Sequence, residues 1–248
     1  MRRYFIDQKI SIQETVVIDG DLFKHIFKVC RCDIGGKFEL LSQDSAYLVE
    51  VKSVAKNLAE VLVLEKRLVP KLKKPHIHLV LANPRPAVFE GVVEKAVELG
   101  VKSIQPITTQ KSFYKSIEKL KLKESRIQKI IIHAMQQTGR VEPLEMKKGL
   151  ELKEFLKLFK EAVSSDKTQG FMFYEALGDG SSDIGGGALE AVEDVFVLVG
   201  GEGGFTAEEA QRAVLAGFSA LLLGEQILRV ETACVAGISI LKSKFSAW

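Results

Sequence analysis

The pattern of hydrophobic and polar residues changes near residue 70. Before it, short segments rich in Val, Leu and aromatic residues alternate with Gly, Asn and Asp, which is typical of strands and turns. Residues 21–32 differ, because Leu22, Ile26 and Val29 recur at helical spacing after Asp21 as a helix start. We therefore expect a small β domain over residues 1–70, a barrel or folded sheet with one helix. Its predicted strands are 2–6, 15–18, 37–42, 46–55 and 59–68.

After a linker at residues 69–76, strands and helices alternate. The predicted strands are 76–83, 101–108, 144–148, 170–177, 193–200 and 218–224, and the helices are 87–100, 123–140, 151–163, 206–217 and 231–245, with a loop at 178–187. Continuously apolar strands that alternate with helices favour a parallel sheet covered by helices on both faces. The second predicted domain is thus an α/β domain over residues 75–248.

Composition narrows the class of protein. The sequence has no run of eighteen apolar residues and no apolar leader, so we expect no membrane span and a cytoplasmic protein. The three cysteines, Cys30, Cys32 and Cys234, are an odd number without metal-ligand spacing, so we expect reduced thiols and no metal site.

Charge is divided unevenly along the chain. Residues 1–140 hold 25 Lys and Arg against 15 Asp and Glu, a net charge of +10, whereas residues 141–248 hold 10 against 17, a net charge of −7. An anionic partner for the first part would explain this division, and so would ordinary solvated lysines.

The stretch LVGGEGGFTAEEA, residues 198–210, places four glycines around Glu202 between an apolar strand and a helix. Thr206 and Glu209 have capping-box spacing, which predicts the helix start at Thr206. The spacing matches neither a P-loop nor a dinucleotide fingerprint, and Glu202 would repel a polyphosphate. The sequence alone leaves two interpretations open: a site for a neutral or cationic ligand that needs bare backbone, or a tight turn without a ligand.

A second glycine-bearing loop follows the next predicted strand, in LLLGEQILRVETACVAG at residues 221–237. Ile227 and Leu228 are unusually apolar for an exposed turn. They suit the wall of an adenine pocket, although packing into the core would explain them as well.

The two loops together resemble the paired C-terminal motifs of the RsmE family in the SPOUT superfamily, I-G-P-E-G-G-[FW]-[ST] and L-G-x-x-I-L-R-x-E-T-A. Gly201 replaces the usual proline and Val230 the usual threonine. Residues 24–40, 95–112 and 133–146 also resemble family segments in the expected order, so the resemblance covers nearly the whole chain.

This resemblance implies an enzyme that uses S-adenosylmethionine to methylate N3 of one uridine in 16S ribosomal RNA, free or within the small ribosomal subunit. It also implies a PUA-like RNA-binding barrel at residues 1–70, a C-terminal trefoil knot, and a homodimer with the active site at the subunit interface. The cofactor contacts it implies are Glu175, Val199, Gly200, Glu202, Gly203, Gly204, Leu223, Gly224, Ile227 and Leu228.

Methylation at N3 requires loss of the proton on that nitrogen. Either a base takes this proton, or a cation stabilises the resulting uridine anion. Arg229 is the first candidate, with a structural ion pair as the alternative, and Arg140 is the second, acting from the partner subunit. Glu231 is a weaker candidate for the base than for a helix N-terminal acid.

RNA contacts are expected from cations and exposed aromatic residues. The predicted phosphate contacts are Arg2, Arg3, Lys28, Arg31 and Lys111, and Phe113 and Tyr114 are candidates for stacking on an unpaired base.

Two other classes of protein compete with this interpretation. One is an RNA-binding module without catalysis, for which intact glycine loops have no purpose. The other is a Rossmann-type oxidoreductase, for which an early G-x-G-x-x-G is missing.

Overall fold

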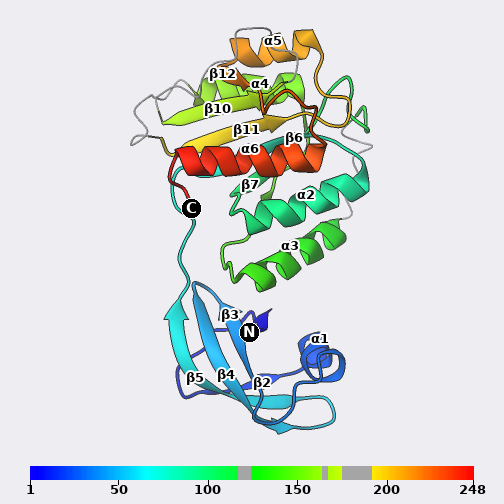
Figure 1. The fold of residues 1–248 in the computed structure, drawn as a ribbon. Coiled ribbons are helices and arrows are strands. Elements are labelled where there is room, and N and C mark those ends of the chain that lie inside the picture. The colour runs from blue at the N-terminus through cyan, green and yellow to red at the C-terminus, as the bar shows by residue number, and fades with distance from the viewer. Residues whose placement is uncertain (117–123, 164–166, 175–191) are drawn as a thin grey trace. The chain divides into compact units, whose positions relative to one another are not determined.

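A computed structural model describes residues 1–116, 124–163, 167–174 and 192–248 of the chain (Figure 1). The chain forms two compact units. The first comprises Met1–Lys71 and Ile132–Pro143, and the second comprises Leu72–Ile131 and Leu144–Trp248. Glu175 and the predicted loop at 178–187 lie outside the described residues.

The first unit contains a curled five-stranded sheet in the order β1-β3-β4-β5-β2. The strands are β1 (Arg3–Phe5), β2 (Thr15–Ile18), β3 (Lys37–Ser42), β4 (Ser45–Val54) and β5 (Ala59–Leu68). β1 and β3 are parallel, and the other pairs are antiparallel. All five strands agree with the sequence pattern, because alternate apolar side chains such as Val49, Val51 and Val61 enter one core.

The predicted helix of this unit forms with a wider turn than expected. It consists of α1 (Gly20–Phe23) followed by a π-helix, η1 (Lys24–Val29), in which the amide of Cys30 bonds the carbonyl of His25. The extra residue per turn brings Phe23, Ile26 and Phe27 into the core and leaves Val29 69% exposed. The predicted apolar face was therefore wrong at Val29, because it assumed the α-helical period.

The second unit contains a sheet in the order β12-β10-β11-β6-β7-β8, with β9 also paired to β7. Every pairing in it is parallel, as the apolar strands predicted. The strands are β6 (His76–Ala82), β7 (Ser103–Thr108), β8 (Glu145–Met146), β9 (Leu150–Glu151), β10 (Thr168–Phe173), β11 (Asp194–Val199) and β12 (Phe218–Leu221). Among the described strands, only β9 was not predicted, because its two residues directly adjoin the helix predicted over residues 151–163.

Among the described residues, four helices belong wholly to this unit: α2 (Pro86–Glu98), α4 (Leu152–Ala162), α5 (Ala207–Leu215) and α6 (Val230–Lys244). α3 (Glu124–Thr138) begins in this unit and ends in the first. The apolar faces of α4 and α5 pack on side chains of β6, β10 and β11. α6 contacts α2, β6 and β11, and Figure 1 shows α6 and α2 side by side. The predicted parallel sheet with accompanying helices is confirmed.

A buried carboxylate joins distant segments of the first unit. Glu39 is only 9% exposed and accepts hydrogen bonds from Arg3 Nε at 2.8 Å and from Arg67 Nε at 2.9 Å. Arg3 also donates to the carbonyl of Gln137 at 2.8 Å. This bond ties residues 132–143 to the first unit, whereas the sequence pattern assigned them to the second domain.

Glu39→Gln should lower the free energy of unfolding by about 2 kcal/mol at pH 7, because both arginines lose a charged acceptor. Burial alone would raise the pKa of Glu39, but hydrogen bonds from Arg67 and Arg3 outweigh it and lower this pKa. The stabilisation is therefore present above the unfolded-state pKa of about 4.3 and is lost as the pH falls below it. Urea denaturation at pH 7 and at acid pH measures the difference.

The matched control is Glu65→Gln, because Glu65 lies exposed on β5. If the two variants lose the same stability, or if the Glu39→Gln deficit persists at acid pH, Glu39 does not organise this unit.

Candidate functional site

A cavity of about 390 Å³ lies at the carboxyl edge of the parallel sheet in the second unit. It is formed by the end of β10, the glycine loop after β11 (residues 200–205) and the loop after β12 (residues 222–229). Ligands of open parallel sheets bind at this edge, and the volume is in the range of small-molecule sites. The expected cofactor residues on its wall are Val199, Gly200, Gly204, Leu223, Gly224, Ile227 and Leu228.

The glycine loop folds back on itself without room for side chains. A Cβ on Gly200 would lie 2.9 Å from the Cα of Gly204, and one on Gly201 would lie 3.2 Å from the carbonyl oxygen of Ala82. Gly204 has φ of +64°, a conformation that glycine adopts without strain. The sequence feature that suggested a ligand therefore also has a packing cause.

The predicted capping box is confirmed. The amide of Glu209 donates to Thr206 Oγ1 at 3.2 Å, and the amide of Thr206 donates to Glu209 Oε2 at 2.9 Å. The second oxygen of the buried Glu209 accepts from the amide of Gln110 at 2.8 Å. The helix start after the glycine loop is thereby fixed to the segment that follows β7.

Glu202 and Gly203 do not line this cavity. Glu202 Oε1 accepts from the amide of Arg85 at 2.9 Å, just before α2. A Cβ on Gly203 would meet the Cβ of Lys111 at 2.9 Å, and Lys111 Nζ donates to the carbonyl of Phe205 at 3.2 Å. Both residues therefore hold the glycine loop against the loops that follow β6 and β7.

The loop after β12 presents apolar side chains to the cavity. Ile227 is 85% exposed, and Leu228 is half-buried. The sequence left open whether these residues pack into the core. They line the cavity instead, which gives it an apolar wall for a flat ring.

Phe173 and Tyr174 also line the cavity, and sequence reasoning missed them. Phe173 ends β10 and Tyr174 follows it, and β10 lies between β11 and β12 in the sheet. A strand order predicted in advance would have found them, since adjacent parallel strands end at one edge. The backbone of the helix α6 also approaches this wall, because a Cβ on Gly237 would lie 2.0 Å from the Phe173 ring.

Arg229 is the residue before α6, directly after the cavity loop, and its side chain is exposed. Its guanidinium forms no ion pair with any described residue. Arg140 belongs to the first unit, where it is 9% exposed and its Nε donates to the carbonyl of Glu142 at 2.5 Å. Burial lowers the pKa of Arg140 to about 10, so it remains a cation at neutral pH.

The residues of the first unit that were expected to contact RNA differ in how far their side chains are engaged by other residues of the protein. Arg2 donates to the carbonyl of Cys30 at 2.8 Å, and Arg3 is held by Glu39. Lys28 Nζ lies 5.5 Å from the centre of the Phe23 ring, and Arg31 is exposed with φ of +51°.

Counting charges by structural unit locates the positive excess of residues 1–140 more closely. The first unit holds 13 Lys and Arg against 11 Asp and Glu, a net charge of +2, whereas residues 72–131 hold 12 against 5, a net charge of +7. The positive excess found over residues 1–140 therefore belongs mainly to the first part of the second unit.

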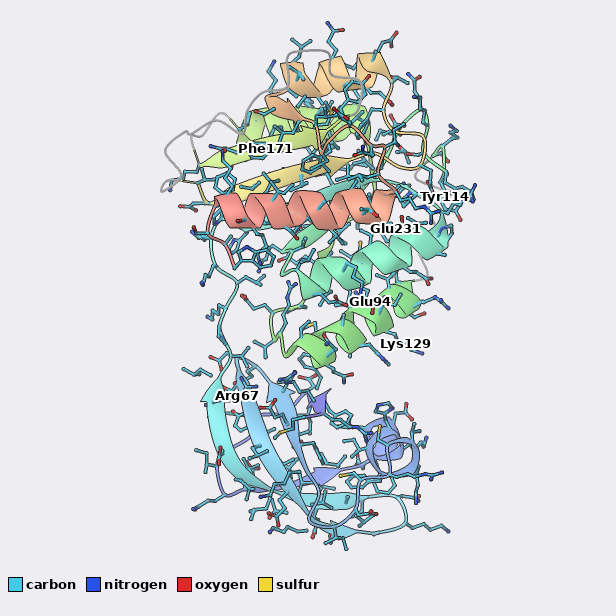
Figure 2. The ribbon with its side chains drawn as sticks, in the orientation of Figure 1. Arg67, Glu94, Tyr114, Lys129, Phe171 and Glu231 are labelled. Atoms are coloured by element: carbon cyan, nitrogen blue, oxygen red, sulfur yellow. The ribbon has the colours of Figure 1, made fainter. Side chains whose placement is uncertain are left out.

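Residues 72–131 also contain a pair of aromatic residues in contact. The rings of Phe113 and Tyr114 meet edge to face with centroids 4.9 Å apart, and Phe113 is 51% exposed. The amide of Phe113 donates to the carbonyl of Asn83 at 2.9 Å, which fixes the pair to the carboxyl end of β6. Figure 2 shows Tyr114 on the same side of the second unit as Glu231, at the start of α6.

Among the described residues, no group of three His, Cys, Asp or Glu side chains is arranged to hold a metal ion. None of the described helices is long and apolar enough to cross a membrane.

A family profile described as an RNA methyltransferase domain matches residues 71–242. Ribosomal RNA small subunit methyltransferase E of Aquifex aeolicus is 33% identical over 227 residues, covering 91% of this chain and 93% of its own. The Bacillus subtilis protein of the same name is 27% identical over 247 residues, covering 96% and 95%.

Solved structures share the fold over nearly the whole chain. The Neisseria gonorrhoeae ribosomal RNA small subunit methyltransferase E, bound to S-adenosylmethionine, has a TM-score of 0.80 at 24% identity and covers 98% of both chains. A Legionella pneumophila methyltransferase in complex with the same cofactor has a TM-score of 0.79 at 24% identity, covering 98% of this chain and 97% of its own.

Proposed function

Because this chain belongs to the RNA methyltransferase family, in its ribosomal RNA small subunit methyltransferase E branch, we propose that it methylates N3 of one uridine in 16S ribosomal RNA with S-adenosylmethionine as donor. The observation that carries the proposal is the cavity between the two glycine-bearing loops. Its position at the carboxyl edge of a parallel sheet, within the region matched by the family, supports a donor site there.

The residues present fit this donor. Gly200 and Gly201 line the cavity as a bare backbone cradle in which a Cβ would press on neighbouring protein atoms, and Ile227 and Leu228 supply an apolar wall for the adenine ring. Backbone N–H and carbonyl groups of the two loops would form hydrogen bonds with the polar groups of the ligand. S-adenosylmethionine, when bound, supplies a methyl group on a cationic sulfonium.

The protein must lower the cost of removing the N3 proton of uridine. Arg229 is exposed beside the cavity loop without an ion pair among the described residues, so its charge is available to the uridine oxygens. We assign it the stabilisation of the uridine anion. Arg140, a buried cation fixed by its own backbone neighbourhood, is the second candidate and would act from the partner subunit of a homodimer.

RNA would approach the basic part of the second unit. Residues 72–131 carry a net charge of +7, and Phe113 offers an exposed ring beside the loops that brace the cavity. Electrostatic attraction of phosphates and stacking of an unpaired base are the usual means of single-strand recognition. In this proposal the first unit is a PUA-like module that adds contacts through Arg2, Lys28 and Arg31, and the C-terminal segment forms a trefoil knot.

The competing classes explain fewer observations. A binding module without catalysis would have no use for the glycine cradle. A Rossmann-type oxidoreductase would bind its cofactor at the first βα turn, whereas here the cavity is formed by late loops after β11 and β12.

The proposal is tested with purified protein, labelled S-adenosylmethionine and small ribosomal subunits from a strain that lacks this protein. We expect label in 16S ribosomal RNA and 3-methyluridine on nucleoside mass analysis, with calorimetric binding of S-adenosylmethionine and none of NADH. Free 16S RNA in parallel identifies the preferred substrate. Label on another base would refute the N3 assignment, and binding of NADH alone would refute the methyltransferase.

Gly200→Ala should weaken S-adenosylmethionine binding roughly tenfold or more, because relieving the close contact with Gly204 costs about 1–3 kcal/mol and opens the loop. The matched control is Gly91→Ala. Gly91 lies within α2, and a Cβ there meets nothing within 4 Å, so affinity should not change. Calorimetry on both variants measures the effect, and equal affinities would show that the cradle does not hold the donor.

Arg229→Met should lower the single-turnover methylation rate by about 10²-fold, the usual effect of removing a donor to a developing anion. Donor and RNA affinities should change much less, since the interaction forms as charge develops on the base. The deficit should shrink at alkaline pH, where solvent removes the N3 proton. Arg229→Lys keeps the charge and should recover part of the rate. A wild-type rate in Arg229→Met with both ligands saturating would transfer the role to Arg140.

A further inference from the structure

Asn83, directly after β6, has a buried polar side chain whose burial should destabilise the protein. It is 0% exposed, and neither its amide nitrogen nor its carbonyl oxygen has a hydrogen-bond partner among the described residues. An unsatisfied buried polar group usually destabilises a protein, and native structures contain few of them. Strain, a catalytic role or a bound water or ion accounts for such groups in native proteins, so Asn83 needs a reason to be polar.

Its surroundings connect it to the glycine loop. A Cβ on Gly201 would lie 3.5 Å from the carbonyl oxygen of Asn83, so the loop backbone rests directly on the end of β6. The backbone of Asn83 is itself fixed, because its amide donates to Ile107 and its carbonyl accepts from Phe113, both at 2.9 Å. Gly201 lines the cavity and Asn83 does not, so the backbone of Asn83 lies behind the part of the wall that Gly201 forms.

We propose that Asn83 is a positioning residue of the donor site, whose carboxamide hydrogen-bonds peptide groups of the glycine loop when the cavity is filled. This inference rests on the proposed donor site. A carboxamide offers both a donor and an acceptor, so it can pair with a peptide group from either side. The loop consists largely of glycine and has few side chains with which to fix its own conformation.

The effect of Asn83 on the stability of the donor-free protein distinguishes a positioning role from a structural role. In the donor-free protein the carboxamide is buried without partners and lowers stability. When the donor is bound, the hydrogen bonds of the carboxamide form. The free energy that they release then contributes to the affinity for the donor. Sites that carry such local costs trade stability for function. A structural asparagine would instead stabilise the donor-free protein.

The test is Asn83→Leu, which keeps a similar volume and removes both polar atoms. We expect donor-free thermal stability equal to or above that of wild type, together with a roughly tenfold or greater loss of S-adenosylmethionine affinity. Hydrogen exchange at residues 200–204 should slow on donor binding in wild type and slow less in the variant. Thermal shift, calorimetry and exchange supply three readouts besides activity.

Ser103→Ala is the matched control, because Ser103 is a buried polar residue at the other end of the sheet, where its hydroxyl pairs with His78 Nδ1 at 2.7 Å. It should lower stability and leave donor affinity unchanged. If Asn83→Leu loses stability as Ser103→Ala does, or binds the donor as wild type does, the positioning role is refuted while the proposed function stands. If wild type itself does not bind the donor, both fall.

Discussion

The parallel pairing of β11 between β10 and β6 is the constraint on which the site depends. Because neighbouring parallel strands end at the same edge, this pairing brings the glycine loop beside Phe173, at the end of β10, and beside Asn83, at the end of β6. β12 pairs on the outer side of β10 and adds the apolar loop that completes the cavity. The ends of three neighbouring strands, with lining residues between Phe173 and Ala233, thus form one pocket.

Close backbone contact at this edge leaves the loop little freedom, and side chains from other loops supply the remaining restraints. Glu202 holds the start of α2, Lys111 holds the carbonyl of Phe205, and Glu209 holds the segment after β7. The sequence assigned Glu202 to cofactor binding and Lys111 to RNA binding, whereas it predicted Glu209 as part of a helix cap. In this fold, the shape of the cavity is maintained by residues that stand outside it.

The loop that holds the glycine loop in place also carries residues proposed to contact RNA. Lys111 and Phe113 belong to one loop, and that loop contacts both Gly203 and the end of β6. Residues 72–131 carry a net charge of +7, whereas the first unit carries +2.

The sequence by itself determined the elements and both glycine-bearing loops, because hydrophobic period, capping residues and glycines act locally. It did not determine the π-helix that turns Val29 outward, since the extra residue per turn is selected by core packing of Phe27. It also left open what Ile227 does and did not identify Phe173 or Asn83. Those roles depend on which strands are neighbours, and strand order is decided by the packing of the whole sheet.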